Sequence, residues 1–550
     1  MYLENINSPA DVKAVGIDKL DILAGEVRKH LLQKLSDHGG HIGPNLGMVE
    51  ATVALHYVFN SPIDKMVFDV SHQSYAHKML TGRKDAFLNP AEYDEVSGYT
   101  EPSESEHDQF VVGHTSTSVS LACGLAKGRD LKGGKENVIA VIGDGSLSGG
   151  EALEGLDMAA ELDTNIIIVV NDNQMSIAEN HGGLYKNLQL LRETNGGAQC
   201  NLFKAMGLDY VYVGEGNNVK ALVEAFQKVK DTTRPVVVHI NTVKGKGYKF
   251  AEEQKERFHW GFPFVIETGE TKKEYQFGPD FGVHTAQMLL DEMQKDPAVV
   301  ALTAGTPGIW GWNAEMRQKA GKQFVDVGIA EETAVAMSSA MAKRGAKPVF
   351  GGTITGLNDV THLGFYDITL LCNIPNMVYL APTCKAEYDA MLRWSIHQTE
   401  HPVAIRVPNV PLEAANDTVA EESYGDLNRY QITHKGSEIA ILGLGGYYAL
   451  AQKVAEKYKE KGIDATVINP RFITGLDTAL LQDLQNGHHT VITLEDGQLD
   501  GGWGEKIARF YGNTPMKVRC YGARKEFVDR FDYNDFLRSN HLTAEQIAED

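Results

Sequence analysis

The sequence predicts an α/β fold built from parallel sheets. The clearest support is the stretch 139–177, where an apolar strand, a Gly-Asp-Gly turn, a helix that opens with small residues and a second buried strand follow one another. This order is that of a βαβ unit. Two further observations agree with it: strands and helices alternate along the rest of the chain, and 550 residues suffice for three or four domains.

The two polar turns of this unit predict a diphosphate site that contains a divalent cation. A right-handed crossover places both turns at the carboxyl edge of the sheet, so Asp144 and Asn173 are expected to meet there. Their side chains and the main-chain carbonyl of Met175 supply the oxygen ligands that Mg²⁺ prefers. Gly143 and Gly145 let a phosphate group approach the backbone, next to a helix amino terminus.

The composition excludes several classes of function. A net charge of −21 argues against nucleic acid and anionic membrane as partners. No apolar run reaches the roughly 18 residues of a membrane span, and the first residues lack a basic region followed by an apolar one, so we expect a soluble cytoplasmic protein. The five cysteines include no C-x-x-C motif, which indicates neither a zinc site nor a disulfide framework.

Histidine recurs in Gly-, Ser- or Thr-rich turns beside strand and helix ends, at His41, His72 and His114. One such residue is more often structural than functional. Three of them together favour a site that binds phosphate and transfers protons at a carbonyl group, because imidazole titrates near neutral pH.

Several other segments have a specific interpretation. Lys244, Lys246 and Tyr248 follow a predicted strand. A short basic run of this kind is usually solvated, but here it is expected at the carboxyl edge of the sheet that holds Asp144 and Asn173. His259 lies further along the chain, between aromatic residues. The polar, glycine-bearing stretch 180–201 is expected to be a mobile surface segment. Glu331 begins a helix, where a carboxylate is usually only a capping charge.

The carboxyl-terminal part predicts a small α/β layer without a catalytic cluster. Its strands are expected within 438–446, 465–472 and 490–496, and a helix within 502–512. The Gly443-x-Gly445 motif is not followed by an acidic residue after a second strand, so dinucleotide binding is disfavoured.

These motifs, taken together, resemble those of the transketolase-like thiamine diphosphate enzymes. The segments that carry the resemblance are HIGPNLGMVEATVALHYVF, DVSHQSYAHKMLTGRKD, GHTSTS, GDG with NDNQMSI, KGKGY, FH and IAEETAV. The closest branch is the one that makes 1-deoxy-D-xylulose 5-phosphate. The resemblance implies a homodimer and three domains, namely a diphosphate-binding domain (1–277), a pyrimidine-binding domain (278–425) and a transketolase carboxyl-terminal domain (426–550).

The resemblance also implies roles for individual residues. Mg²⁺ is held by Asp144, Asn173 and the carbonyl of Met175. Glu331 binds the aminopyrimidine ring of thiamine diphosphate. The residues that contact the rest of the cofactor are His72, Gly113, His114, Thr115, Asp144, Gly145, Ser146, Asn173 and Tyr248. Catalysis is assigned, besides Glu331, to His41, His259 and His362.

The implied reaction is decarboxylation of pyruvate, followed by condensation of the remaining carbons with an aldehyde sugar phosphate. Two alternatives remain open. One is a related transferase that uses a different aldehyde, and the other is a catalytically impaired relative that binds the cofactor or serves as a scaffold.

The sequence departs from the family pattern in the second domain. After Phe350 one strand–helix unit is missing, so either the domain is shortened or the sequence lacks a segment that the molecule contains. The two family arginines that bind the acceptor phosphate fall at Gly351 and Asn409. The loss of two guanidinium groups weakens a phosphate site unless other cations replace them.

Overall fold

The computed structural model describes residues 1–276, 280–351, 364–407, 420–529 and 531–550. The chain divides into two compact units, the first comprising Met1–Gly278, Ala301–Ala340 and Phe350–Gly352, and the second the remainder. The predicted domain 1–277 lies in the first unit and the predicted domain 426–550 in the second. The three domain boundaries themselves stay a prediction.

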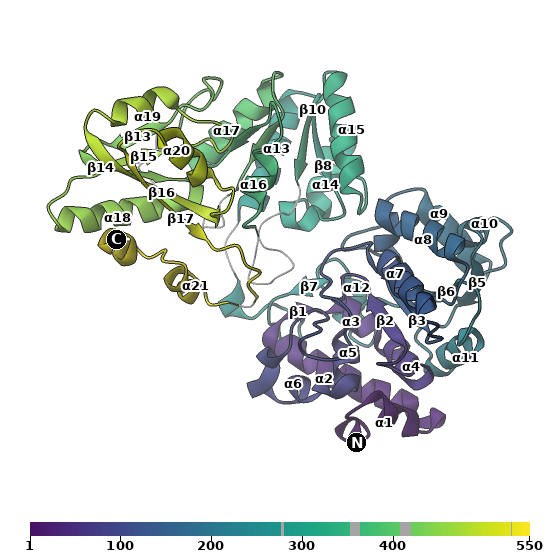
Figure 1. The fold of residues 1–550 in the computed structure, drawn as a ribbon. Coiled ribbons are helices and arrows are strands. Elements are labelled where there is room, and N and C mark those ends of the chain that lie inside the picture. Colours follow the sequence, from purple (N-terminus) through teal and green to yellow (C-terminus); the bar gives the residue numbers. More distant parts are fainter. Residues whose placement is uncertain (277–279, 352–363, 408–419, 530) are drawn as a thin grey trace. The chain divides into compact units, whose positions relative to one another are not determined.

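The first unit is organised around a five-stranded sheet in which all strands are parallel, as the sequence predicts (Figure 1). In spatial order its strands are β2 (Lys65–Phe68), β3 (Val138–Gly143), β4 (Ile167–Asp172), β6 (Val236–Asn241) and β5 (Asp209–Val213). A short antiparallel pair lies beside it, formed by β1 (Gly40–His41) and β7 (Trp260–Gly261).

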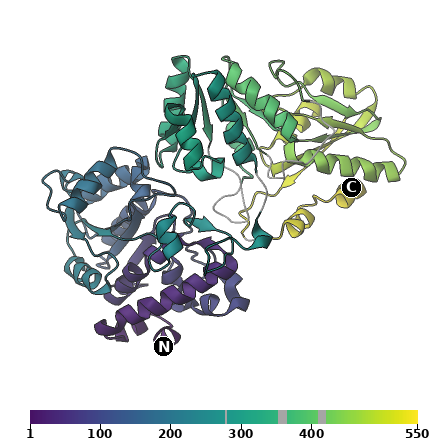
Figure 2. The ribbon, with the colours of Figure 1, turned by 180° about the vertical axis from the view of Figure 1, so that it is seen from behind.

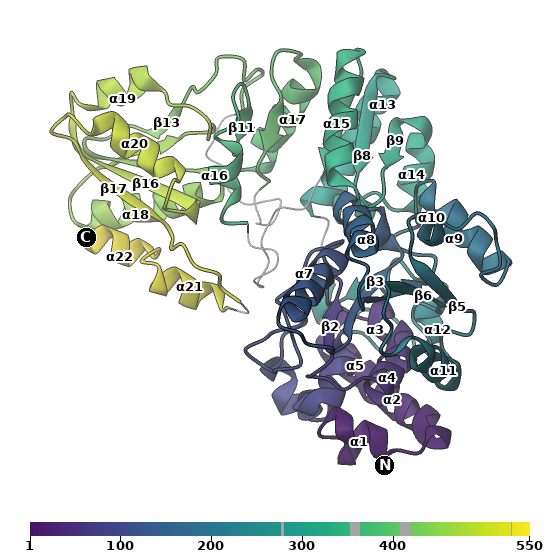
Figure 3. The same cartoon turned by 45° about the vertical axis from the view of Figure 1, so that its right-hand side comes forward.

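The helices of residues 1–276 cover both faces of this sheet (Figure 3). They are α1 (Pro9–Ala14), α2 (Leu20–His38), α3 (Gly43–Gly47), α4 (Val49–Val58), α5 (Tyr75–Lys78), α6 (Asp85–Leu88), α7 (Ser118–Leu131), α8 (Gly150–Leu162), α9 (Leu184–Glu193), α10 (Leu202–Ala205), α11 (Val219–Val229) and α12 (Lys249–Glu253).

Strand β3 shows why this arrangement follows from the sequence. Its residues are apolar without interruption, and successive side chains point to opposite faces. Ile139 and Val141 join the core formed with α2, α4 and α11, whereas Ala140 and Ile142 join the core formed with α7 and α8. A strand buried on both faces requires a helical layer on each side.

The stretch 180–201, predicted to be a mobile surface segment, contains a helix that the sequence analysis did not predict. Helix α9 occupies its centre, and Leu188 and Leu191 on that helix are fully buried. These leucines form one apolar stripe at helical spacing, which the flanking glycines and polar residues obscure.

The region of the predicted second domain forms two small sheets within the described residues. One has the order β10 (Lys347–Gly351), β8 (Val299–Thr303), β9 (Phe324–Asp326), and the other pairs β11 (Val378–Leu380) with β12 (Val403–Ile405) in parallel. Its helices are α13 (Phe281–Lys295), α14 (Ala314–Ala320), α15 (Glu331–Lys343), α16 (Asp367–Leu371) and α17 (Lys385–His397). The positions of His362 and Asn409 lie outside the described residues.

A second five-stranded sheet lies in the second unit, and its strands confirm those predicted for 426–550 (Figures 1 and 2). Its order is β13 (Gln431–His434), β15 (Thr466–Asn469), β14 (Glu438–Gly443), β16 (His488–Gln498) and β17 (Lys517–Ala523). Strand β13 is antiparallel to its neighbour and the other pairs are parallel.

Helices also cover this second sheet on both faces. They are α18 (Tyr448–Glu460), α19 (Thr478–Leu484), α20 (Trp503–Tyr511), α21 (Tyr533–Ser539) and α22 (Ala544–Glu549). Helices α18 and α22 pack into one core, and α19 and α20 into the other. Throughout the described part of the chain, every helix is too short or too polar to cross a membrane.

Candidate active site

The turns after β3 and β4 meet at the carboxyl edge of the first sheet, as predicted. Gly143 lies opposite Asn171 in adjacent strands, which brings the two turns together. Asp144 is 1% exposed, and its Oδ1 lies 3.5 Å from the main-chain nitrogen of Asn173. The side-chain oxygen of Asn173 accepts a hydrogen bond from the nitrogen of Met175 at 3.2 Å. The three proposed cation ligands therefore belong to one compact group.

The polar atoms of this group fit a bound cation. Burial, and secondly the nearby Asp172 carboxylate, raise the pKa of Asp144 to about 7. Asn180 donates a hydrogen bond to Oδ2 of Asp144 at 2.6 Å, while its own Oδ1, like the Oγ of Ser176, is buried and has no hydrogen-bond partner among the described residues. A cation at this carboxylate would offset the cost of burying the charge.

Among the described residues, no three or more His, Cys, Asp or Glu side chains form a group that could hold a metal. The donor set predicted here is of a different kind, because it combines one carboxylate with amide and main-chain oxygens. Such a set is typical of Mg²⁺ and not of zinc.

Three of the predicted histidines converge. The ring centroids of His41 and His72 are 4.9 Å apart, those of His41 and His259 are 5.7 Å apart, and those of His72 and His259 are 5.4 Å apart. The ring of Tyr99 lies 5.9 Å from that of His41. Pairing of β1 with β7 places His41 opposite Trp260, which brings the distant His259 segment beside it. We call His41, His72 and His259 the histidine cluster.

Burial keeps His72 and His259 of the histidine cluster neutral. It lowers the pKa of His72 and of His259 well below the ordinary value for imidazole, and the neighbouring charges of the cluster and of Lys244 add to the effect. The Nδ1 of His72 is buried and has no hydrogen-bond partner within the described chain. Neutral rings with a free nitrogen are suited to binding a ligand and to proton transfer.

Lys244 connects the histidine cluster to the cation ligands. Its side chain is 1% exposed, its Nζ donates to the carbonyl of Ser176 at 2.5 Å, and the same Nζ lies 3.1 Å from Nδ1 of His259. Burial lowers the pKa of Lys244 to about 7. Because Ser176 directly follows Met175, the lysine links the two halves of one site. Lys244 was predicted to lie at this edge of the sheet, but no specific role was predicted for it.

Asn45 is a site residue that the sequence analysis missed. It is fully buried, and its Nδ2 donates to the carbonyl of His41 at 2.8 Å and to that of His72 at 2.7 Å. Its Oδ1 accepts from the nitrogen of Tyr75 at 3.0 Å. The available signal was an amide side chain inside an otherwise glycine-rich and apolar loop.

The Gly113-His114-Thr115 turn lies beside the Gly-Asp-Gly turn but not in the histidine cluster. Asp69, which the sequence analysis also missed, accepts hydrogen bonds from the nitrogens of Ser116 and Ser118 at 2.8 and 3.0 Å. The hydroxyl of Ser116 donates to the carbonyl of Ser146 at 2.9 Å. His114 is exposed, and its Nδ1 accepts from the nitrogen of Thr115.

Gly145 illustrates the close backbone approach that the motif requires. A Cβ at this position would lie 2.9 Å from the Cα of Ser176. The turn that follows Asp144 therefore has no room for a side chain.

Tyr248 and Glu331 occupy different surroundings. Tyr248 packs among Phe250, Phe258 and Phe264, and its hydroxyl donates to the carbonyl of Ile266 at 2.9 Å. Glu331 is half-buried at the first position of α15.

The segment just before Glu331 is hydrogen-bonded to Ser148, which follows the Gly-Asp-Gly turn. The hydroxyl of Ser148 accepts from the nitrogen of Ile329 at 3.1 Å and lies 3.3 Å from its carbonyl oxygen. Glu331 follows two residues later.

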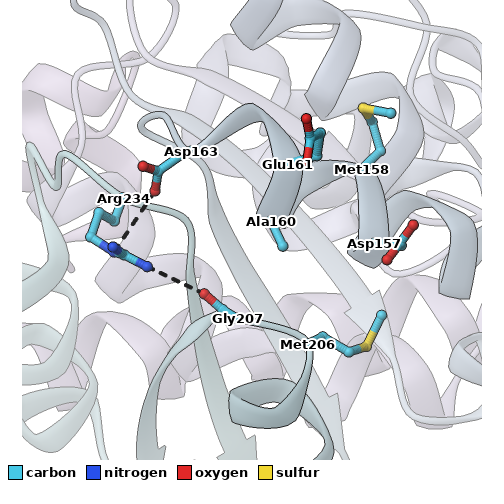
Figure 4. A pocket seen from close by; sticks show the side chains of 8 residues that line it. All are labelled: Asp157, Met158, Ala160, Glu161, Asp163, Met206, Gly207 and Arg234. Carbon is cyan, nitrogen blue, oxygen red and sulfur yellow. Dashed lines mark hydrogen bonds and ion pairs between the residues drawn. The ribbon is translucent and has the colours of Figure 1, made fainter.

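A shallow surface hollow of about 490 Å³ lies at the opposite, amino edge of the same sheet (Figure 4). Arg234 lies there, with its Nε 3.8 Å from Asp163, and donates to the carbonyl of Gly207 at 3.4 Å. No predicted site residue lines it, so the hollow is separate from the candidate active site.

Comparison with known proteins agrees with these observations. The family model described as 1-deoxy-D-xylulose-5-phosphate synthase matches residues 3–200. The model of the transketolase thiamine diphosphate binding domain matches residues 120–317, and that of the transketolase carboxyl-terminal domain matches residues 428–547. A solved transketolase from Campylobacter jejuni aligns with 97% of this chain and 99% of its own at 16% identity, with a TM-score of 0.41.

Curated relatives named 1-deoxy-D-xylulose-5-phosphate synthase match over the whole chain. The protein from Symbiobacterium thermophilum is 35% identical over 622 positions, which cover 100% of this chain and 94% of the relative. The protein from Clostridium tetani is 33% identical over 616 positions, covering 100% and 98%. The first alignment exceeds the 550 residues of this chain by 72 positions, so at least that many positions of the alignment are gaps in this chain. The chain belongs to the 1-deoxy-D-xylulose-5-phosphate synthase family of transketolase-like enzymes.

Proposed function

We propose that this chain is a thiamine diphosphate-dependent transferase that decarboxylates pyruvate and condenses the remaining carbons with glyceraldehyde 3-phosphate, giving 1-deoxy-D-xylulose 5-phosphate and CO₂. The observation that carries the proposal is the convergence of His41, His72, His259 and Lys244 next to the turns of Asp144 and Asn173. The family names of the relatives supply the identity of the substrates.

The carboxyl edge of the first sheet would hold the cofactor. Thiamine diphosphate, when bound, supplies an electron sink for the loss of CO₂ from a 2-keto acid. Asp144, Asn173 and the carbonyl of Met175 would hold Mg²⁺ at the diphosphate, and the donor set supports this assignment.

The remaining cofactor contacts follow the family motifs. The Gly113-His114-Thr115 turn and the turn that follows Asp144 would contact the diphosphate. The residues expected to do so are Gly113, His114, Thr115, Gly145 and Ser146. Glu331 would bind the aminopyrimidine ring, and His72 and Tyr248 are the further contacts.

The histidine cluster would hold and move protons at the reacting carbonyl oxygen. Lys244 donates toward Nδ1 of His259, which leaves the proton of the neutral ring on Nε2, where it can be donated to a substrate oxygen. His41 lies at the same place and would act with it. His362 completes the proposed catalytic set and lies outside the described residues.

A different aldehyde acceptor is the second candidate, because Gly351 and Asn409 stand where the resemblance places the family's phosphate-binding arginines, and the described cation nearest in sequence to Asn409 is already engaged. Arg406 is the nearest cation in sequence to Asn409, yet all three of its guanidinium nitrogens are engaged within the chain. Nε donates to Asp367 at 2.7 Å, one terminal nitrogen to Asp496 at 2.5 Å, and the other to the carbonyl of Gly364 at 2.9 Å. Arg406 therefore has a structural role that competes with phosphate binding.

The chain is proposed to act as a cytoplasmic homodimer. Helix α15 supports an assembly, because Val335 and Met337 on it are 55% and 37% exposed and Ala334 is the helix's buried residue among those described. A helix of this apolar character normally packs against another surface. The five cysteines are all free, in keeping with a reducing compartment.

The test is incubation of the purified chain with ¹³C-labelled pyruvate, glyceraldehyde 3-phosphate, thiamine diphosphate and Mg²⁺, followed by NMR of the products. We expect labelled 1-deoxy-D-xylulose 5-phosphate, and no product from His259→Ala beyond about 1% of the wild-type rate. Release of CO₂ without a condensed product would contradict the proposed transferase activity.

A further inference from the structure

The backbone immediately before His72 has an unusual conformation. Val70 and Ser71 have φ angles of +57° and +65°. Residues other than glycine rarely adopt this left-handed region, and for a β-branched residue such as valine it is an outlier. A conformation of this kind persists only when the surroundings fix it, and it concentrates at functional sites.

The Ser71 hydroxyl holds this conformation together with main-chain hydrogen bonds of the turn, from Ser71 to the carbonyl of Asp69 and from Ser74 to the carbonyl of Ser71. Ser71 is fully buried, and its Oγ donates to the carbonyl of Val112 at 2.7 Å and accepts from the nitrogen of Thr100 at 3.0 Å. Within the segment from Thr100 to Val112, the hydroxyl of Thr100 donates to the carbonyl of Phe110 at 2.8 Å. One buried hydroxyl therefore closes both ends of the loop 100–112.

The ends of this loop lead directly into the candidate site. Tyr99, whose ring lies 5.9 Å from that of His41, precedes Thr100. Gly113, the first residue of the Gly113-His114-Thr115 turn, follows Val112, and His72 follows Ser71 itself. The positions of these three site elements are thus related through a single oxygen atom.

The middle of the loop is anchored independently of Ser71. Asp108 accepts two hydrogen bonds from Arg83, at 2.7 and 2.9 Å, and one from the nitrogen of Glu101 at 2.7 Å. It also accepts from His77 at 2.9 Å. Loss of the Ser71 hydroxyl should therefore release the ends of the loop without unfolding its middle.

We infer that Ser71 is a positioning residue for the reaction proposed above. Through the two hydrogen bonds of its hydroxyl, Ser71 couples His72 to the loop carrying Tyr99 and to the Gly113-His114-Thr115 turn. Ser71 touches no substrate in this assignment. It acts through the residues on either side of it and through the loop ends that it holds.

Two substitutions separate the hydroxyl from the backbone conformation. Ser71→Ala removes the hydroxyl and keeps a side chain at a positive φ angle, whereas Ser71→Gly removes the hydroxyl and also relieves the strain. We expect Ser71→Gly to melt at a higher temperature than Ser71→Ala. Both variants should lose activity to the same extent, about tenfold in kcat, because the lost contact is the same.

Hydrogen exchange provides a measurement that does not depend on activity. In both variants the amides of residues 97–118, and Thr100 above all, should exchange faster than in the wild type at a temperature well below melting, while the strands β3 and β4 remain protected. Ser74→Ala is the matched control: Ser74 is also a buried serine of this turn, and its hydroxyl has no hydrogen-bond partner among the described residues. It should change neither exchange nor kcat.

Two results would overturn the inference. One is unchanged exchange of residues 97–118 in both Ser71 variants, and the other is recovery of wild-type kcat in Ser71→Gly, which would assign the effect to strain alone. An inactive wild-type protein would instead refute the proposed function, and the exchange experiment would still test the role of Ser71.

Discussion

Asp144 is a single side chain whose ionised form is costly in the absence of a cation. It is 1% exposed, burial raises its pKa to about 7, and an amide hydrogen from Asn180 compensates for burial only in part. The affinity of the protein for a diphosphate should therefore depend on a divalent ion at this carboxylate.

We expect Asp144→Ala to abolish thiamine diphosphate binding measured by calorimetry, with an unchanged circular dichroism spectrum. Asp163→Asn is the control, since Asp163 lines the hollow at the other edge of the same sheet and is exposed. The control should bind like the wild type. Binding by the wild type that is undiminished in EDTA would rule out the cation site.

Glu331 is a second residue whose role can be separated from that of a helix cap. If it binds the aminopyrimidine ring, Glu331→Gln should retain cofactor binding but slow exchange of the C2 proton of the bound thiazolium by about 10²-fold or more, measured by deuterium uptake in NMR. Glu332, the next residue of α15, is exposed and provides the control Glu332→Gln. Exchange within twofold of the wild type in Glu331→Gln would reduce Glu331 to a cap.

The histidines show how far sequence patterns predicted the site at this scale. Turn composition selected His41 and His72, whose rings lie 4.9 Å apart, but it grouped them with His114, which is exposed and bonded within its own turn. The third ring of the cluster belongs to His259. No local pattern reveals this, because the pairing of two-residue strands more than 200 residues apart brings it there.

At the level of helices and strands, the regular repeats were predictable and the short elements were not. The buried run of β3 and the alternation of strands and helices predicted a parallel sheet in the first unit and the strands β14, β15 and β16 of the second sheet, but not β13 and β17. Strands β1 and β7 have two residues each, too few for any periodicity. Helix α9 was missed because glycines flank its three-leucine stripe.

The junction of β16 and α20 predicts a dependence of stability on pH. Glu495 is fully buried at the end of β16 and accepts hydrogen bonds from the first two nitrogens of α20, Trp503 and Gly504, at 2.8 and 2.7 Å. Burial raises its pKa to about 7, although those two amides oppose the shift. The folded state then binds a proton that the unfolded state releases near pH 4.5. The stabilisation that comes from protonated Glu495 is fully present below pH 4.5 and is lost as the pH rises to about 7.

The substitution Glu495→Gln should remove this dependence, because a neutral amide keeps an acceptor oxygen for α20. Between pH 5 and pH 8 the wild type should lose roughly 1 to 3 kcal/mol of stability relative to the variant, measured by denaturant unfolding at both pH values. Glu505→Gln, at an exposed position of the same helix, should retain the wild-type slope. Equal slopes for Glu495→Gln and the wild type would show that Glu495 does not titrate in this range.

The whole molecule is shorter than the alignment with its relatives. At least 72 positions of the alignment with the Symbiobacterium thermophilum protein have no counterpart in this chain, and within the described residues the second-domain region forms two small sheets. The sequence predicted a shortened second domain from the absence of a strand–helix unit after Phe350. It could not predict how the remaining strands pair, since pairing depends on contacts between distant segments.

The exposed face of α15 leads to a prediction about assembly. If Val335 and Met337 are covered by a second copy of the chain, the protein should have twice the mass of one chain in light scattering after size-exclusion chromatography. Val335→Glu should shift it toward the monomer, whereas Ile22→Glu, at an exposed position of α2, should not. A monomeric wild type at micromolar concentration would contradict the dimer.

The choice of aldehyde acceptor follows from the charges that the shortened chain lacks. By the family resemblance, the two phosphate-binding arginines are expected at the positions of Gly351 and Asn409. A Cβ at Gly351 would lie 2.8 Å from the ring of Trp310, so no arginine fits there without a shift. Arg406 is fully engaged with Asp367 and Asp496. The acceptor phosphate should therefore add little binding energy in the transition state.

We expect kcat/KM for D-glyceraldehyde to lie within about tenfold of that for its 3-phosphate, and Asn409→Arg to increase the preference for the phosphate, because a guanidinium can bind it through two hydrogen bonds. The measurement is kcat/KM for both aldehydes in both proteins. A wild-type preference for the phosphate of about 10³ or more, worth some 4 kcal/mol, would contradict the prediction. It would mean that a cation elsewhere in the chain, such as Lys246, has replaced the missing arginines.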